Sequence, residues 1–202
     1  LVSPWVEKRH HDVEVDHDSV AWKLNPSKEE LHRMRAYYYA NVEMIDSQVG
    51  NILDALEERG NMDNTIVIFT SDHGDNLGDH GLIQKWAPYD EVTRVPLIIA
   101  APGRFESGRI VNEMVQLFDL APTILEWAGV TPDPTFEAIS LNPALEGSKF
   151  DGRAHVFCEQ AADVNMTGAS YLTMVRSLTH KLIHFRDSEE GQLFDLLSED
   201  GE

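Results

Sequence analysis

The sequence predicts an α/β fold in which helices flank a layered sheet, followed by a small antiparallel sheet. Three observations carry this prediction: a long amphipathic helix over residues 27–60, two short apolar runs that follow it, and short alternating strands after Phe150. A helix, a strand, a long loop, a second strand and another helix in this order are typical of α/β folds. We therefore expect a main body over residues 1–150 and an antiparallel subdomain over residues 151–202.

The first helix is predicted from its cap and from its period. Ser27 followed by Glu30 is a capping box, in which two side chains satisfy backbone donors of the first turn. Apolar residues then recur every three or four positions from Leu31 to Leu56, which indicates one apolar stripe that we expect to pack in the core. Gly60 suits the left-handed residue that ends a helix.

The two strands are predicted from continuous apolar runs. Residues 64–69 read NTIVIF, and residues 94–103 read RVPLIIAAPG. Short runs without alternation are typical of strands buried on both faces of a parallel sheet, so we expect that environment here. A polar, glycine-rich segment, 71–93, separates the runs, and residues 116–129 form a second helix that ends at Gly129.

Composition and charge exclude several classes of function. Thirty-five acidic and 16 basic residues give a net charge of −19, which repels phosphate backbones and anionic lipid, so neither nucleic acid nor a membrane surface is an expected partner. No apolar run is long enough to span a membrane, and we expect a soluble protein, with cytoplasmic, periplasmic and secreted locations all left open. The chain opens without methionine or a signal peptide, which indicates a processed or truncated product. The one cysteine, Cys158, forms no internal disulfide and is expected to pack as a small hydrophobe.

Metal-ligand side chains gather where the first strand ends. The segment TSDHGDNLGDHG, residues 70–81, contains two histidines and three aspartates. In open α/β sheets, ligands bind outside the carboxyl ends of the strands. Asp72 and His73 are adjacent, and Gly74 can turn the backbone so that both side chains face one cation. By ligand type alone, a carboxylate with an imidazole favours manganese, zinc or iron over calcium or magnesium.

Further charged side chains follow in the same loop. Asp75, Asp79 and His80 are candidates for the remaining ligands or for groups that orient them. Lys85 adds a cation twelve residues beyond His73. A lysine beside a metal suits an anionic tetrahedral group, because both stabilise charge on its oxygens. The opposing interpretation is a turn-rich loop whose acids and glycines simply favour turns.

These segments resemble the sulfatase family of the alkaline-phosphatase-like superfamily. The stretches TIVIFTSDHGDNLGDHGLIQKW and PYDEVTRVPLIIAAPG carry the resemblance most specifically. YYYANVEMIDSQVGNILDALEERG, VQLFDLAPTILEWAGV, MVRSLTHKLIHF and GQLFDLLSEDGE are similar to other parts of that family and occur in its order, so the likeness covers roughly residues 30–202. The resemblance implies an alkaline-phosphatase-like layered sheet with flanking helices.

The resemblance also implies a role for each site residue. Asp72 and His73 would be the metal pair, and Lys85 the catalytic lysine that binds the substrate oxyanion. Asp79 and His80 would shape the pocket, with His80 as a substrate-binding residue. Members of this family generally use calcium, contrary to the ligand-type argument, whereas some phosphonate- and phosphodiester-cleaving relatives use manganese or another divalent metal.

The nucleophile of that family is missing from the sequence. It is a cysteine or serine in a Cys/Ser-x-Pro/Ala-x-Arg stretch that matures to formylglycine, and it precedes the metal strand, as do two further metal-binding aspartates. Cys158 does not replace it, because FCEQAAD lacks the arginine and follows that strand. We therefore expect the C-terminal part of such an enzyme, inactive alone, with the missing N-terminal part of its own chain as a partner.

The function expected from the resemblance is hydrolysis of a small sulfuric ester by a metal-dependent, formylglycine-type mechanism. Two alternatives stay open: a phosphonate monoester or phosphodiester hydrolase of the same superfamily, and a noncatalytic anion-binding module. A two-metal phosphomutase or phosphatase fits less well, because it needs a second Asp and His cluster. The acids and histidines of residues 9–18 favour a solvated loop over such a site, since they follow no fixed ligand spacing.

Overall fold

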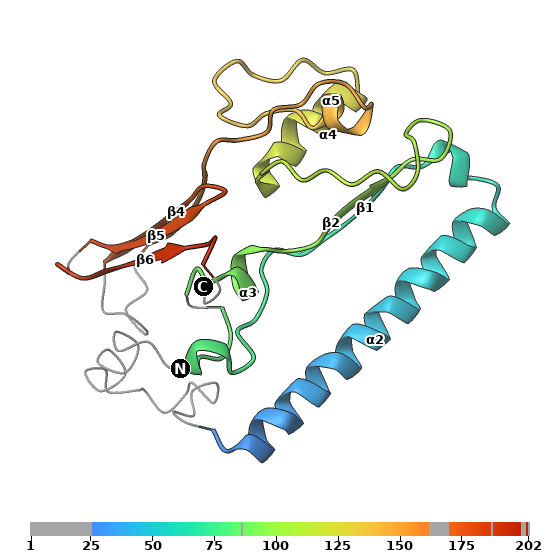
Figure 1. Cartoon of the computed structure of the whole chain (residues 1–202). Coiled ribbons are helices and arrows are strands. Elements are labelled where there is room, and N and C mark those ends of the chain that lie inside the picture. The colour runs from blue at the N-terminus through green and yellow to red at the C-terminus, as the bar shows by residue number, and fades with distance from the viewer. Residues whose placement is uncertain (1–25, 86, 162–169, 187, 199–200, 202) are drawn as a thin grey trace.

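The computed structural model describes residues 26–85, 87–161, 170–186, 188–198 and residue 201, so the tract at 9–18 lies outside the described residues (Figure 1). In chain order the elements are α2 (Lys28–Glu58), η1 (Met62–Asn64), β1 (Val67–Thr70), η2 (Asp79–Gly81), α3 (Asp90–Thr93), β2 (Leu97–Ala100), η3 (Leu117–Asp119), α4 (Leu120–Trp127), α5 (Asn142–Leu145), β3 (Val156–Ala161), β4 (Tyr171–Arg176), β5 (His180–Phe185) and β6 (Gly191–Asp195). Among the described helices, none is both long and apolar enough to cross a membrane.

Helix α2 begins with the predicted capping box. The Ser27 backbone N–H donates to Glu30 Oε2 at 2.9 Å, and the Glu30 N–H donates to Ser27 Oγ at 3.2 Å. The expectation that its apolar stripe packs in the core is wrong for the described chain, because no residue of α2 is buried and Ile52 is 61% exposed. Figure 1 shows the helix standing apart from most of the body. The helix forms as the period predicts, and the described chain leaves most of its apolar stripe accessible.

Strands β1 and β2 form a two-stranded antiparallel sheet in which Val67 lies opposite Ala100. The expected parallel arrangement with both faces buried is therefore wrong for this pair. The connection between the two strands stays at the end of β1 and does not cross back over the sheet (Figure 1), so β2 runs in the opposite direction. No residue of either strand is fully buried in the described chain. A continuous apolar run predicts a strand, but it does not specify the direction of the neighbouring strand.

The predicted second helix is present as η3 and α4, and a buried carboxylate fixes where it begins. Asp119 accepts from the N–H groups of Gln116 and Ile139 at 2.8 Å each, and from Arg153 Nε at 2.9 Å. These donors compensate the burial of its charge. Asp119 therefore ties the start of the helix to the two loops that follow it.

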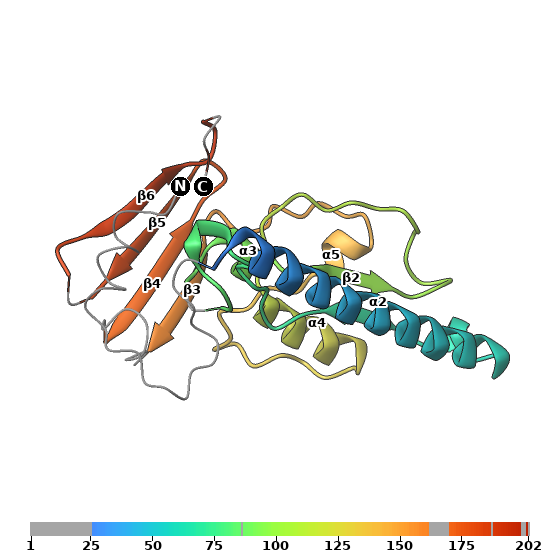
Figure 2. The ribbon, with the colours of Figure 1, turned by 90° about the horizontal axis from the view of Figure 1, so that it is seen from below.

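Strands β3 to β6, called the C-terminal sheet below, form the four-stranded antiparallel sheet that the sequence predicts. Their spatial order follows the chain, and Met174 lies between Cys158 and Ile183 on the neighbouring strands. Cys158 packs against the core as expected, and burial raises the pKa of its thiol. Figures 1 and 2 show this sheet at one end of the molecule, and the C-terminal end of α2 at the other.

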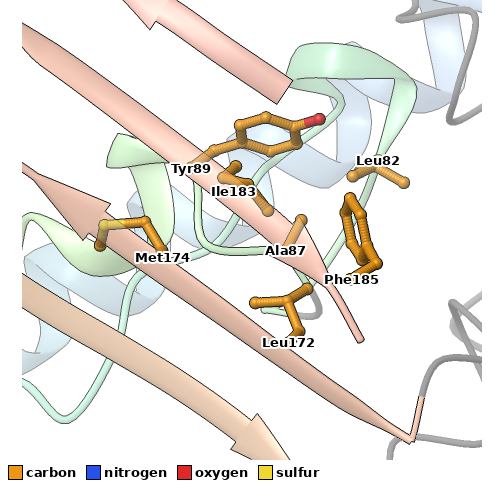
Figure 3. Close-up of a cluster of buried hydrophobic side chains, with 7 residues drawn as sticks. All are labelled: Leu82, Ala87, Tyr89, Leu172, Met174, Ile183 and Phe185. Carbon is orange, nitrogen blue, oxygen red and sulfur yellow. The ribbon is translucent and has the colours of Figure 1, made fainter. Parts of the chain in front are cut away.

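A cluster of buried hydrophobic side chains lies between the C-terminal sheet and the loop that follows β1 (Figure 3). The loop contributes Leu82, Ala87 and Tyr89, and the sheet contributes Leu172, Met174, Ile183 and Phe185. Burial of this apolar surface is the main force that holds the loop on the sheet. The same loop carries the charged side chains singled out by the sequence.

Candidate active site

Three of the predicted site residues come together just beyond the end of β1. Lys85 Nζ lies 2.9 Å from His73 Nε2, and Asp72 Oδ2 lies 3.5 Å from the same nitrogen. The strand delivers Asp72 and His73, and the loop returns after twelve residues to deliver Lys85. A carboxylate, an imidazole and an amine thus meet around one atom, while the roles assigned to them stay predictions.

The orientation of the His73 ring is set by its own turn. Nδ1 lies 2.8 Å from the Gly74 carbonyl oxygen, which can only accept, so we assign the ring proton to Nδ1. Nε2 then carries the lone pair and accepts from the Lys85 amine. A backbone carbonyl that fixes the tautomer in this way is typical of histidines that ligate metals.

The Asp72 carboxylate is open to solvent and held in its ionised form. Its side chain is 85% exposed, and its Oδ1 accepts from the His73 backbone N–H at 3.0 Å. That backbone hydrogen bond lowers the pKa of the Asp72 carboxyl below its usual value, and the positive charge of nearby Lys85 adds to the effect. An ionised, accessible carboxylate is what cation binding requires.

Asp75 and Asn76 tie the two ends of the site loop together. Asp75 Oδ1 accepts from the N–H groups of Leu77 and Gln84 at 2.8 and 3.0 Å. The Asn76 backbone N–H and side-chain amide both donate to the Gln84 carbonyl, at 2.9 and 2.6 Å. These contacts bring Lys85, the next residue, back to His73. Asp75 is therefore engaged in holding the loop, and Asn76 is a supporting residue that the sequence analysis missed.

Asp79 and His80 are directed to other neighbours. Asp79 Oδ1 accepts from Arg35 of α2 at 2.9 Å, which links the loop to the helix. The His80 ring stacks on Tyr89 with centroids 4.0 Å apart, and its Nε2 lies 3.3 Å from Glu91 Oε2. The substrate-binding role of His80 stays a prediction.

Gly74 allows α3 to approach the site. Its N–H donates to the Val92 carbonyl at 2.8 Å, and a Cβ at this position would lie 1.8 Å from the Glu91 carbonyl oxygen. Only glycine fits so close to another backbone. The turn that carries His73 is therefore in direct contact with α3.

The donor chemistry fits part of a metal shell. Asp72 and His73 offer one oxygen and one nitrogen on the same side of the loop, as the 3.5 Å separation requires. Among the described residues, no group of three or more histidine, cysteine, aspartate or glutamate side chains is placed to hold a metal ion. A complete shell therefore needs further donors besides these two.

Comparison with known proteins identifies the family. A family model described as Sulfatase matches residues 3–130, and a second one, N-sulphoglucosamine sulphohydrolase, C-terminal, matches residues 78–202. An arylsulfatase from Clostridium perfringens is 33% identical over 200 residues, which cover 97% of this chain and 40% of that protein.

Solved structures agree with the family models. Phosphonate monoester hydrolase SpPMH from Silicibacter pomeroyi matches with a TM-score of 0.80 and 31% identity over 89% of this chain and 38% of its own. BT4656, solved in complex with its substrate D-glucosamine-2-N,6-O-disulfate, matches with a TM-score of 0.76 and 31% identity over 86% of this chain and 37% of its own. The chain thus spans about 40% of the length of these relatives. It belongs to the sulfatase family of the alkaline-phosphatase-like superfamily, and its fold is the α/β fold of that superfamily with an antiparallel sheet of four strands.

Proposed function

We propose that this chain supplies the metal-binding and oxyanion-binding part of a sulfatase active site that hydrolyses sulfuric esters. The observation that carries the proposal is the convergence of Asp72 Oδ2 and Lys85 Nζ on His73 Nε2. A purely structural turn would not require an exposed, ionised carboxylate beside a histidine whose second ring nitrogen faces an amine.

Asp72 and His73 would hold one divalent cation, calcium as first candidate and manganese as the alternative. When bound, the cation would supply Lewis-acid stabilisation of negative charge on the ester oxygens. Nε2 of His73 has one lone pair, so it cannot bind a cation and accept from Lys85 at the same time. With His73 engaged in holding a cation, the Lys85 amine would be available to donate to an oxygen of the bound ester, whose charge grows in the transition state.

The chain would act together with the part of the sulfatase fold that it does not match, which is expected to carry the formylglycine nucleophile and further metal ligands. Two apolar surfaces support this partner. One is the exposed stripe of α2. The other is a cavity of about 870 Å³ along β2, lined by Leu97–Ala101, residues 105–111 and the α5 segment among others. A two-stranded sheet is marginally stable by itself, so further strands beside β1 and β2 would complete it.

A phosphonate monoester or phosphodiester hydrolase is the second candidate, because a phosphonate monoester hydrolase structure matches with a TM-score of 0.80. Both reactions place negative charge on oxygens of a tetrahedral centre, so Asp72, His73 and Lys85 suit either. The substrate of BT4656, a sulfated glucosamine, supports a small sulfated substrate for the first candidate.

The test assays the complete protein that carries this sequence with aryl sulfate and aryl phosphodiester substrates in parallel. We expect aryl sulfate to be preferred, and Lys85→Met to lower kcat by about 10² to 10³, the usual cost of losing an oxyanion donor. Lys149→Met is the matched control, since this exposed lysine pairs with Asp151 at the surface. Asp72→Ala should abolish calcium binding, measured by calorimetry, while the far-UV circular dichroism spectrum is retained. Full activity of Lys85→Met and of Asp72→Ala would exclude the proposed site. A preference for the phosphodiester substrate would select the second candidate.

A further inference from the structure

The site loop rests on the C-terminal sheet on both sides of Lys85. Leu82 precedes Lys85 and Ala87 follows it, and both are almost completely buried against the sheet. Figure 3 shows their side chains among Leu172, Ile183 and Phe185, together with Tyr89 and Met174. The backbone at Lys85 is therefore held at both sides by contacts with strands that lie about 90 residues further along the chain.

A cluster of charged side chains ties the same sheet to α3. Asp90, the first residue of α3, accepts from Lys181 Nζ at 3.1 Å and from Arg176 through both of its carboxylate oxygens. Lys181 is fully buried, at an inward position of β5. A buried ammonium is costly unless an anion compensates it, so this contact strongly favours one position of Asp90.

Helix α3 in turn contacts the turn that carries His73. The Glu91 carbonyl oxygen lies so close to Gly74 that a Cβ there would meet it. The Val92 carbonyl accepts from the Gly74 N–H at 2.8 Å. A displacement of α3 would therefore displace Gly74, and with it His73. One segment, residues 87–93, thus connects the sheet to both His73 and Lys85.

We propose that the cluster of Arg176, Asp90 and Lys181 is a positioning device that sets the distance between His73 and Lys85. It acts through α3 and needs no contact with a substrate. The proposal rests on the proposed function only for its consequence in catalysis, because the distance itself can be measured without a substrate.

The test uses the complete protein that carries this sequence and two readouts from nuclear magnetic resonance. One is amide hydrogen exchange at Gly74, and the other is the nuclear Overhauser effect between the Lys85 side chain and the His73 ring. Arg176→Gln should accelerate exchange at Gly74 about tenfold and weaken the Overhauser effect, since a charge-assisted contact of α3 is lost. Arg176→Lys should restore most of both signals. Arg186→Gln, the matched control at an exposed turn position directly after β5, should change neither.

Lys181→Met provides a second variant that removes the buried charge without leaving a cavity. It should shift the same two signals in the same direction while exchange in β4 stays within about twofold of the parent chain. Equal acceleration at Gly74 and throughout β4 would reveal general destabilisation and overturn the proposal, as would unchanged signals in both variants.

The same variants in the complete protein separate this inference from the proposed function. We expect Arg176→Gln to lower kcat about tenfold with little change in KM, because binding groups remain present but are misplaced. Absence of sulfatase activity in the parent protein would refute the proposed function, while the exchange and Overhauser data would still decide the positioning role.

Discussion

Replacing Gly74 by alanine tests whether the approach of α3 sets the site geometry. A Cβ at residue 74 would lie 1.8 Å from the Glu91 carbonyl oxygen, whereas ordinary van der Waals contact begins at 3.4 Å. The Cβ is fixed directly to the backbone and its neighbour is a backbone oxygen, so neither atom can move away by a side-chain rotation. The turn and α3 must separate by roughly 1.6 Å, which is enough to break the hydrogen bond between Gly74 and Val92.

Two costs follow from this separation. Overpacking between rigid backbones costs about 1–3 kcal/mol, and the lost hydrogen bond adds about 1 kcal/mol. We therefore expect Gly74→Ala to lower the free energy of unfolding by about 3 kcal/mol. In the complete protein, a displacement of about 1 Å at His73 should lower kcat/KM by about 10², since reacting groups tolerate little misplacement.

Urea unfolding of the chain measures the first cost, and steady-state kinetics of the complete protein measure the second. Gly50→Ala is the matched control, because a Cβ there meets no atom within 4 Å and Gly50 lies inside α2. It should stabilise the helix by up to about 1 kcal/mol and leave kcat/KM unchanged. If Gly74→Ala unfolds at the parent midpoint with an unchanged slope and retains kcat/KM within twofold, the contact does not constrain the site.

Two further predictions concern titration and stability. Because the His73 N–H stabilises the ionised form, the Asp72 carboxyl should titrate below 3.8, so its charge persists as pH falls to that value; a midpoint at or above 3.8 in a carbon-13 titration would contradict this. Asp119→Asn should lower the free energy of unfolding by about 3 kcal/mol, because it leaves the Arg153 guanidinium without its anion; urea unfolding measures the loss, and a change under 1 kcal/mol would refute the argument.

The elements that could be predicted from the sequence are those determined by local interactions. The capping box of Ser27 and Glu30 involves residues three positions apart, and the structure contains it. The contact between Lys85 and His73 also depends on one loop, whose acids and glycines close it over twelve residues. The direction of β2 depends instead on where segment 71–96 runs, which no period of apolar residues encodes.

The cluster around Asp90 could be predicted only in part from the sequence. Alternation in β5 places Lys181 on the same face as Ile183 and Phe185, so a lysine at an inward position could have been recognised as unusual. Its partner could not, because Asp90 lies 91 residues earlier in the chain. The sequence indicates a long-range ion pair only where one of its charged residues occupies a position that the apolar pattern predicts to be buried.

The two sides of the candidate site differ in how far the described chain supports them. Lys85 is held by a core that this chain supplies on its own, through buried residues of β4 and β5. Asp72 and His73 are delivered by β1, whose residues are all partly or fully accessible and whose one described strand neighbour is β2. Because only the lysine side of the site has its complete support here, we expect weak cation affinity in the isolated chain, and stronger affinity once further strands cover β1 and the stripe of α2.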